Sequence, residues 1–213
     1  NLPVRNVVSW NALISGYVDN GRGNEALVCF ENMEAEGVSP SPVTFIHSLK
    51  ACDNVETIDK IHAEIAKKGL LEKDVMLSST LVYIYAKIGM IIKAQDVFDK
   101  LQYRNVVSWN VLIAGYGQQG DTGSVFSIFK KMLEDGIEPD QVTFVIVLAA
   151  CNHAGLVEEG QCFFNTMTNI YLISPTSEHY TCMVDLFSRA GHFDKAVIEI
   201  NRAPHSDRFQ LWF

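Results

Sequence analysis

Long apolar runs and basic residues are both scarce in this sequence. No stretch approaches the ~18 uncharged apolar residues that a membrane span needs, although 48% of the residues are hydrophobic. The 17 Lys and Arg residues are outnumbered by 25 Asp and Glu, which gives a net charge of −8. Nucleic-acid-binding domains usually carry a basic patch, so the placement of the charge matters more than its sum. We expect no membrane span and no membrane partner.

The five cysteines form no pattern typical of a metal site or a disulfide framework. They are odd in number and contain no C-x-x-C pair. Cys52 and Cys151 occupy the same place in two related stretches, which favours small buried packing residues. Free thiols fit a reducing compartment or an organelle interior. The chain also lacks an initiating Met and a secretory signal, and we expect it to be an excerpt of a longer protein.

One stretch of the sequence occurs twice. Residues 6–21 and 105–120 are identical at eleven of sixteen positions, at an offset of 99. The phrase at 42–52 returns at 141–151 with the same offset, and each phrase starts an element of similar pattern. The true period is therefore about a third of the offset, with units at 7–41, 42–74, 75–105, 106–140, 141–176 and 177–207. Units of 31 to 36 residues indicate stacked repeats rather than one globular core.

Each unit is predicted to form two helices joined by a tight turn. In the second half of the first unit, apolar residues recur at helical spacing from Ala26 to Met33, and Gly37 and Pro40 end the helix. The first half, 8–20, contains VVSWNALI, which also suits a buried strand. A strand would need a partner in every unit, whereas the second halves are plainly helical. We therefore predict an all-α fold, a right-handed superhelix of helical hairpins.

Charged residues separate between the two helices of each unit. In the first four units the first helices are nearly neutral, with Asp19, Lys50 and Lys87 as exceptions, whereas the second helices hold most of the acids. If the first helices line the concave surface, the negative charge lies mainly outside. An anionic ligand can then approach the inner face, because the distant acids are screened by salt.

Several phrases together resemble the pentatricopeptide repeat family. They are VVSWNxLIxGY, VTFxxxLxAC, YAKxGxxxxAxxVFD, NHAGLVEEG and EHYTCMVDLFSRAG. The succession of unit lengths is similar to the alternating P, L and S repeats of plant organelle RNA-editing factors. On this resemblance, 1–6 ends a preceding S repeat, 7–41 and 106–140 are P repeats, 42–74 and 141–176 are L repeats, 75–105 and 177–207 are S repeats, and 208–213 starts a C-terminal extension motif.

The resemblance implies sequence-specific binding of single-stranded RNA, with one base per repeat. In the family, the fifth and last residues of a P or S repeat bond to the base edge, and the second residue clamps the base. Short polar groups and apolar contacts suit this task. The implied pairs are Asn11 with Ser41 for C, Ser79 with Asn105 for A, Asn110 with Asp140 for U, and Thr181 with Asp207 for G. The L units place Ile46 and Val145 at the fifth position and should read little, so the predicted target is 5′-CnAUnG.

Two further rows of residues follow from the same resemblance. The clamping row is Val8, Val43, Met76, Val107 and Val142, and Glu178 interrupts it in the sixth unit. Eight residues beyond the fifth position, Lys87 and Arg189 are candidates for phosphate contact. Two solvated charges near a helix end are an equally open explanation. Asp19 opposes phosphate locally, so we expect the affinity to be modest and strongly salt-sensitive.

Three other motifs favour structural explanations. Residues 115–120 match G-x-G-x-x-G, but the sister copy lacks the middle glycine. His62-Ala-Glu64 matches half of a zinc deaminase signature without the downstream C-x-x-C that this chemistry needs, so His62 is interpreted as a helix-surface residue. Trp10 and Trp109 are predicted to pack between helices rather than to stack on bases.

The resulting functional prediction is the recognition tract of an organelle C-to-U RNA-editing factor. We expect single-stranded organelle RNA and other editing-complex proteins as partners, a mitochondrial or chloroplast location, and no small-molecule substrate. No catalysis, metal or cofactor is expected in these residues, whereas a C-terminal deaminase domain would make a longer parent protein an enzyme. The alternative is a peptide-binding solenoid of the tetratricopeptide kind. A gel shift with a CnAUnG oligonucleotide distinguishes the two.

Overall fold

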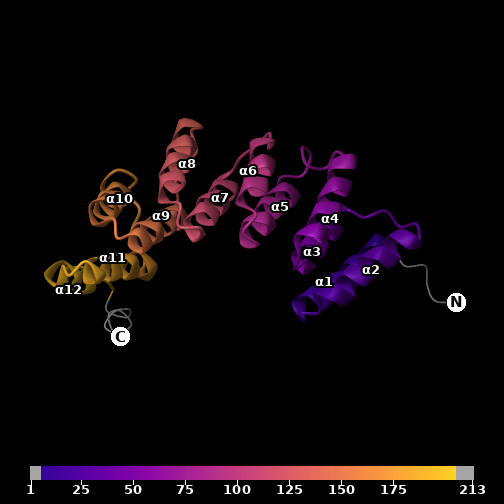
Figure 1. Ribbon diagram of the computed structural model, residues 1–213, viewed down its shortest axis with the longest axis horizontal. Coiled ribbons are helices and arrows are strands. Elements are labelled where there is room, and N and C mark those ends of the chain that lie inside the picture. Colours follow the sequence, from indigo (N-terminus) through magenta and orange to yellow (C-terminus); the bar gives the residue numbers. More distant parts are fainter. Residues whose placement is uncertain (1–5, 205–213) are drawn as a thin grey trace. The chain divides into compact units, whose positions relative to one another are not determined.

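The computed structural model describes residues 6–204. Within this range the chain forms twelve α-helices and no strand (Figure 1). The prediction of an all-α fold built from helical hairpins is confirmed. The strand alternative for VVSWNALI is wrong, because these residues lie in a helix. The chain divides into two compact units, Asn1–Arg104 and Asn105–Phe213, each of which corresponds to three of the six shorter units defined from the sequence. We call these two compact units the first unit and the second unit.

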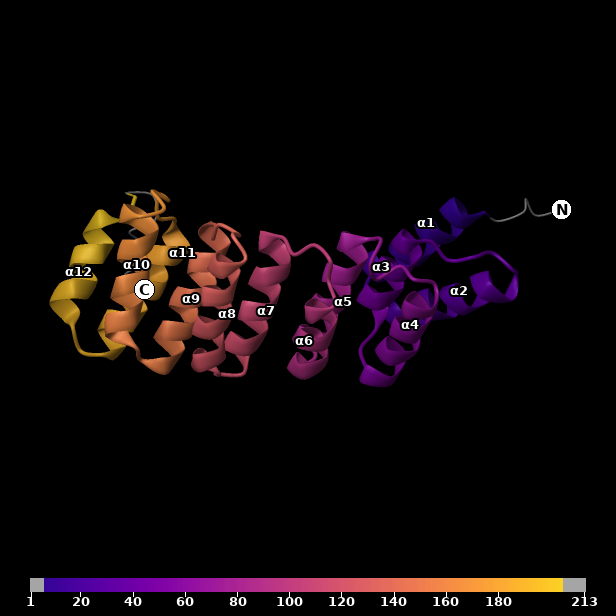
Figure 2. The ribbon, with the colours of Figure 1, turned by 90° about the horizontal axis from the view of Figure 1, so that it is seen from above.

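The first unit contains three helical hairpins. Its helices are α1 Val7–Asp19, α2 Gly23–Ala35, α3 Pro42–Ala51, α4 Val55–Lys67, α5 Val75–Lys87 and α6 Ile91–Asp99. The first helices of the hairpins contact one another in series, α1 with α3 and α3 with α5. Each second helix packs against the first helix of its own hairpin, and α2 and α4 also contact the first helix of the next hairpin (Figure 2).

The second unit repeats this plan. Its helices are α7 Val106–Gln118, α8 Thr122–Glu134, α9 Gln141–Ala154, α10 Val157–Asn169, α11 Ser177–Arg189 and α12 Phe193–Arg202. Again the first helices contact one another, α7 with α9 and α9 with α11. No described helix is both long enough and apolar enough to cross a membrane.

The first helices begin after short polar residues that act as N-caps. The side chains of these residues accept a hydrogen bond from a backbone N–H in the first turn of the helix, at Asn6, Ser41, Asp74, Asn105 and Asp140. Such a cap satisfies one of the four N–H groups that have no partner inside the helix. Each of these residues is also the last residue of a short unit defined from the sequence. The last residue of one such unit is therefore the N-cap of the first helix of the next.

The second helices of the units at 7–41 and 106–140 end as their Gly and Pro residues predict. Gly37 and Gly136 have φ values of 76° and 74°. This left-handed conformation is strained for a residue with a Cβ atom, and it closes the end of a helix. Pro40 and Pro139 follow and prevent the helix from continuing.

The core of each unit is formed where the first and second helices face one another. Trp10 and Trp109 are only 1% and 3% exposed, so the prediction that they pack between helices is confirmed. Cys151 is buried as predicted, and burial raises the pKa of its thiol to about 12. Cys52 is half-buried, and its Sγ donates to the carbonyl oxygen of Ser48.

Candidate nucleic-acid interface

Asn11, Ser41 and Thr44 form the first polar triad. Asn11 lies in the middle of α1, Ser41 is the N-cap of α3, and Thr44 lies in the first turn of α3. The Nδ2 of Asn11 donates to the Oγ of Ser41 at 3.3 Å, and the Oγ1 of Thr44 donates to the Oδ1 of Asn11 at 2.6 Å. Residues 30 positions apart in the sequence are therefore joined at the junction of two hairpins.

Asn110, Asp140 and Thr143 form the second polar triad, at the equivalent place between α7 and α9. The Nδ2 of Asn110 donates to the Oδ1 of Asp140 at 3.0 Å, and the Oγ1 of Thr143 donates to the Oδ1 of Asn110 at 2.7 Å. The structure thus brings together two of the four predicted base-reading pairs, Asn11 with Ser41 and Asn110 with Asp140.

Asp140 is a carboxylate at neutral pH. Burial acts to raise its pKa, but hydrogen bonds from the backbone N–H of Thr143 and the side-chain amide of Asn110 outweigh burial, so the pKa lies below its ordinary value. An ionised carboxylate can only accept hydrogen bonds, whereas the hydroxyl of Ser41 can donate or accept. The two triads therefore share a geometry and differ in chemistry at one position.

Neither of the other two predicted pairs lies within the described residues of one compact unit. Ser79 belongs to the first unit and Asn105 to the second, where Asn105 caps α7 by accepting from the Ser108 amide at 2.9 Å. The side chain of Thr181 is exposed, and its hydroxyl donates to the Ser177 carbonyl oxygen at 2.8 Å. The partner predicted for Thr181, Asp207, lies outside the described residues.

The predicted clamping residues share an exposed position on the second residue of a first helix. Their exposed fractions are 69% for Val8, 49% for Val43, 71% for Met76, 57% for Val107 and 55% for Val142. Apolar side chains in a recurring exposed position are available to a ligand with an apolar face. In the sequence unit at 177–207 the same position holds Glu178, which is also exposed.

The fifth residues of the units at 42–74 and 141–176 are less exposed than the clamping residues. Ile46 is 9% exposed and Val145 is half-buried. Neither side chain has a hydrogen-bonding group, so neither can contact the polar edge of a base.

The two candidate phosphate-binding residues are both exposed and both end a first helix. Lys87 is the last residue of α5, and Arg189 is the last residue of α11. A cation at a helix C-terminus also interacts favourably with the helix dipole. Their position therefore suits either a phosphate contact or a purely structural role.

Sequence reasoning missed the threonine of each triad. Thr44 and Thr143 are fully buried, and each donates to an Asn 33 residues earlier in the chain. The only signal in the sequence was the phrase VTF, which occurs at 43–45 and again at 142–144. Repetition marks these threonines as structurally equivalent, but it does not identify their partners.

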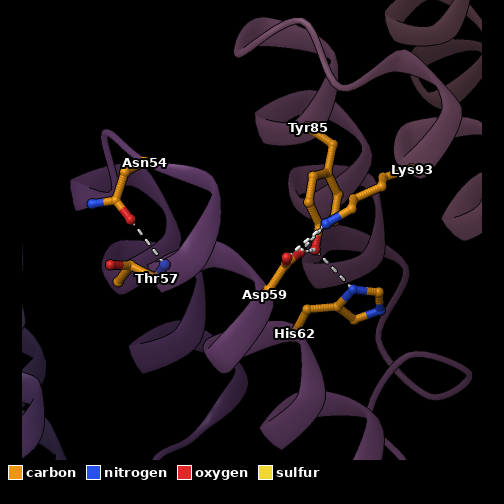
Figure 3. A network of polar contacts seen from close by, with 6 residues as sticks. All are labelled: Asn54, Thr57, Asp59, His62, Tyr85 and Lys93. Carbon is orange, nitrogen blue, oxygen red and sulfur yellow. Dashed lines mark hydrogen bonds and ion pairs between the residues drawn. The ribbon is translucent and has the colours of Figure 1, made fainter.

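The prediction that His62 is a helix-surface residue is wrong. His62 is half-buried, and its Nδ1 lies 3.0 Å from the Oη of Tyr85. Tyr85 donates in turn to Asp59 at 2.7 Å, and the Nζ of Lys93 lies 2.6 Å from the other carboxylate oxygen of Asp59 (Figure 3). We call these four residues the Asp59 cluster. It joins α4, α5 and α6, and its contacts explain why His62 faces inward.

The described residues contain no group of three or more His, Cys, Asp or Glu side chains that could hold a metal ion. The glycine motif at 115–120 begins inside α7 and does not follow a strand. It therefore lacks the strand-to-helix context that dinucleotide binding requires.

Sequence profiles of known families match this chain. The profile of the PPR repeat family matches residues 5–70 and 104–153, and the PPR repeat profile matches 78–106 and 178–198. The pentatricopeptide repeat-containing protein CRR2, chloroplastic, of Arabidopsis thaliana is 44% identical over 200 residues, which cover 92% of this chain and 30% of the relative. Another Arabidopsis thaliana pentatricopeptide repeat-containing protein, named as mitochondrial, is 37% identical over 94% of this chain and 30% of its own length.

Solved structures show the same fold. The pentatricopeptide repeat protein PPR10 in complex with an 18-nt psaJ RNA element has a TM-score of 0.75 at 22% identity, covering 90% of this chain and 29% of that chain. The crystal structure of PPR10 from maize has a TM-score of 0.64. This chain spans about 30% of the length of the two Arabidopsis relatives. Because the profile of the PPR repeat family matches more than half of its residues, this chain belongs to the pentatricopeptide repeat family.

Proposed function

We propose that this chain binds single-stranded RNA in a sequence-specific manner, with one base per repeat, and recognises 5′-CnAUnG. The observation that carries the proposal is the pairing of Asn11 with Ser41 and of Asn110 with Asp140 at the same junction in both units. A peptide groove has no need for polar pairs at a fixed separation of 30 residues. Further support comes from PPR10, which has the same fold and is seen with an RNA element.

The second triad suits uracil. The carboxylate of Asp140 accepts hydrogen bonds only, and the N3 position of uracil carries an N–H that can donate to it. Cytosine instead has a lone pair at N3, which would face the carboxylate unfavourably. Asn110 has a second N–H on Nδ2, beyond the one given to Asp140, that can serve a pyrimidine carbonyl oxygen.

The first triad suits cytosine. The hydroxyl of Ser41 can donate to the unprotonated N3 of cytosine, which a carboxylate cannot do. The second N–H of Asn11 can serve the O2 carbonyl oxygen, as Asn110 does for uracil. The preferences of Ser79 with Asn105 for A and of Thr181 with Asp207 for G are carried over from the family resemblance.

The exposed apolar residues complete each base site in this proposal. Val8 precedes Asn11 by three residues, and Val107 precedes Asn110 by three, so each pair lies on one face of its helix. An apolar side chain there can pack on the flat face of a base while the Asn bonds to the edge. Lys87 and Arg189 would contact phosphates.

A binding assay tests the RNA-binding proposal. The 213-residue chain is titrated in gel shifts with CnAUnG, with the same oligonucleotide changed only at the two n positions, and with a scrambled sequence, over a series of salt concentrations. We expect CnAUnG and its n variants to bind equally and more tightly than the scrambled RNA, with an affinity that falls as the salt concentration rises. Equal binding to all three RNAs would contradict the proposed function.

The proposal extends to the recognition tract of a plant organelle C-to-U RNA-editing factor that works with other editing-complex proteins. Support comes from the relatives named chloroplastic and mitochondrial. Binding alone is assigned to these residues. Disruption of the gene, followed by sequencing of organelle transcripts, should abolish C-to-U conversion near a CnAUnG tract. Unchanged transcripts would contradict the editing role and leave RNA binding untouched.

A further inference from the structure

The threonine of each triad contacts both the N-cap residue of its own helix and the Asn predicted to contact the base. Each is the third residue of a first helix, and its Oγ1 accepts from the backbone N–H of the N-cap residue, Ser41 or Asp140, at 3.0 Å. That bond leaves the hydroxyl proton free to be donated. The Asn oxygens accept it, at 2.6 Å in the first triad and 2.7 Å in the second. Each hydroxyl also has an alternative acceptor, the Oγ of Ser41 at 3.0 Å in the first triad and the Oδ1 of Asp140 at 2.9 Å in the second.

The direction of this bond decides which end of the Asn amide faces its other neighbours. When the hydroxyl donates to Oδ1, the amide NH₂ group turns toward the last residue of the unit. One N–H then bonds to Ser41 or Asp140, and the other remains for a base. A flipped amide would present a carbonyl oxygen instead and would lose its match to a pyrimidine carbonyl.

The sequence varies consistently with this role. Within the described residues, a hydroxyl is found at the third position of each first helix that follows a unit with a polar fifth residue: Thr44 after Asn11, Ser108 after Ser79 and Thr143 after Asn110. The residues that follow the unit of Thr181 lie outside this range. The units with an apolar fifth residue, Ile46 and Val145, are followed instead by Leu77 and His179. His179 accepts from the N-cap N–H as the threonines do, so capping by itself does not require a hydroxyl.

We infer that Thr44 and Thr143 are positioning residues for base selection, because their hydroxyls hold the amides of Asn11 and Asn110 with an N–H toward the base. This inference rests on the proposed RNA-binding function. The two sites should depend on it unequally. The Asp140 carboxylate, which only accepts, still favours the correct amide direction without the threonine. The Ser41 hydroxyl accepts or donates and therefore tolerates either direction.

The test compares Thr44→Val and Thr143→Val with the unchanged chain. Binding is measured to CnAUnG and to RNAs in which the first C is changed to U or the fourth-position U to C. We expect Thr44→Val to reduce the C-over-U preference at the first base about tenfold, the loss of one hydrogen bond to a base. Thr143→Val should reduce the preference at the fourth position by about threefold. Each variant should leave the other site unchanged.

Conservative and structural controls separate positioning from stability. Thr44→Ser and Thr143→Ser keep the hydroxyl and should retain the preferences. Ser124→Ala removes a similar hydroxyl from the third position of α8, where it donates to the cap residue Asp121 at 2.7 Å and contacts no base-reading Asn. This control should lower the thermal unfolding midpoint without changing any base preference. If Thr44→Val does not fold, Thr44→Cys is tested in its place, because it keeps a side chain of similar size with a weaker hydrogen-bond donor.

The outcomes distinguish this inference from the function on which it rests. If the unchanged chain shows no base preference, the proposed function fails. If the unchanged chain discriminates and the folded Val variants keep both preferences, the positioning role is overturned and RNA recognition stands. A loss at both sites that Ser does not restore also contradicts the inference, because the hydroxyl would not be the group responsible.

Discussion

The two units of the chain place the same triad at the same junction and differ in a single member. The distance from the Asn Nδ2 to the last residue is 3.3 Å with Ser41 and 3.0 Å with Asp140, and the threonine bonds measure 2.6 and 2.7 Å. The fold therefore fixes the geometry of the site, and the last residue is free to vary. Under the proposed function, a change in base preference then needs no change in helix packing.

A second comparison concerns the Asp59 cluster and the residues at the equivalent positions of the second unit. The Asp59 cluster of the first unit has an equivalent in the second, formed by Gln161, Phe164, Phe187 and Lys195. Lys93 lies 5.7 Å from the ring centre of Tyr85, and Lys195 lies 5.4 Å from that of Phe187. Lys195 donates to Gln161 at 3.3 Å, where Lys93 forms an ion pair with Asp59. The lysine keeps its place over the ring while its acidic partner is replaced by a neutral amide, so this packing does not require the carboxylate.

The largest expected effect follows from changing the Asn of each triad to Thr. Asn110→Thr keeps the Asp140 carboxylate, which can accept from the N–H donors of guanine, and should move the fourth preference from U toward G. In Asn11→Thr the neighbouring residue is Ser41, which has no carboxylate. This variant should lose the preference for C at the first base without gaining one for G. The expected change is about 10- to 100-fold in relative affinity, the value of a specific base contact. Competition binding with the four bases at each position measures it. An unchanged preference for U in Asn110→Thr would contradict the account.

The next effect concerns helix packing in the first unit. A Cβ added to Gly23 would lie 2.6 Å from the carbonyl oxygen of Ala51, which is backbone and cannot move independently. The equivalent residue in the second unit is Thr122, where a side chain is accommodated. Gly23→Ala should cost about 1–3 kcal/mol of unfolding free energy, measured by urea denaturation. Thr122→Ala is the matched control and should cost much less. Equal costs would show that the close approach of α2 and α3 is unimportant.

The end of α2 could be predicted because its cause is local: Gly37 followed by Pro40 ends a helix. The N-caps at Ser41 and Asp140 were not predicted and are seen only in the structure. The contacts of Thr44 and His62 could not be predicted. Thr44 bonds to Asn11 on another hairpin, and His62 bonds to Tyr85 on the next helix, so both depend on how helices pack rather than on periodicity within one helix.

A smaller effect is expected from Tyr85. Its ring is fully buried and its hydroxyl donates to Asp59, whereas Phe187 stands in the same place without a hydroxyl. Tyr85→Phe makes the first unit resemble the second and should lower the unfolding free energy by about 1 kcal/mol, the net value of one hydrogen bond. Lys93 and Asp59 are each more than 40% exposed, so their ion pair should contribute less. A loss above that of Gly23→Ala would show that the cluster is more important than we propose.

The smallest effect is a pH dependence. Burial, with Lys100 nearby, holds the pKa of His62 below its ordinary value, although Asp59 opposes the shift. Below about pH 6.5 the unfolded chain therefore binds a proton at His62 that the folded chain does not, and stability falls. His62→Phe copies Phe164 of the second unit and should lose less unfolding free energy between pH 7 and pH 5 than the unchanged chain. Identical losses would contradict this assignment, because His47 and His179 titrate in both proteins.

The most direct test of the central claim exchanges the one member that distinguishes the triads. The chain carrying both Ser41→Asp and Asp140→Ser is compared with the unchanged chain in competition binding between CnAUnG and UnACnG, in which the two pyrimidines are exchanged. If the last residue selects the pyrimidine, the unchanged chain prefers CnAUnG and the exchanged chain prefers UnACnG. If both proteins prefer the same RNA, or neither discriminates, the claim that these triads read the bases is contradicted.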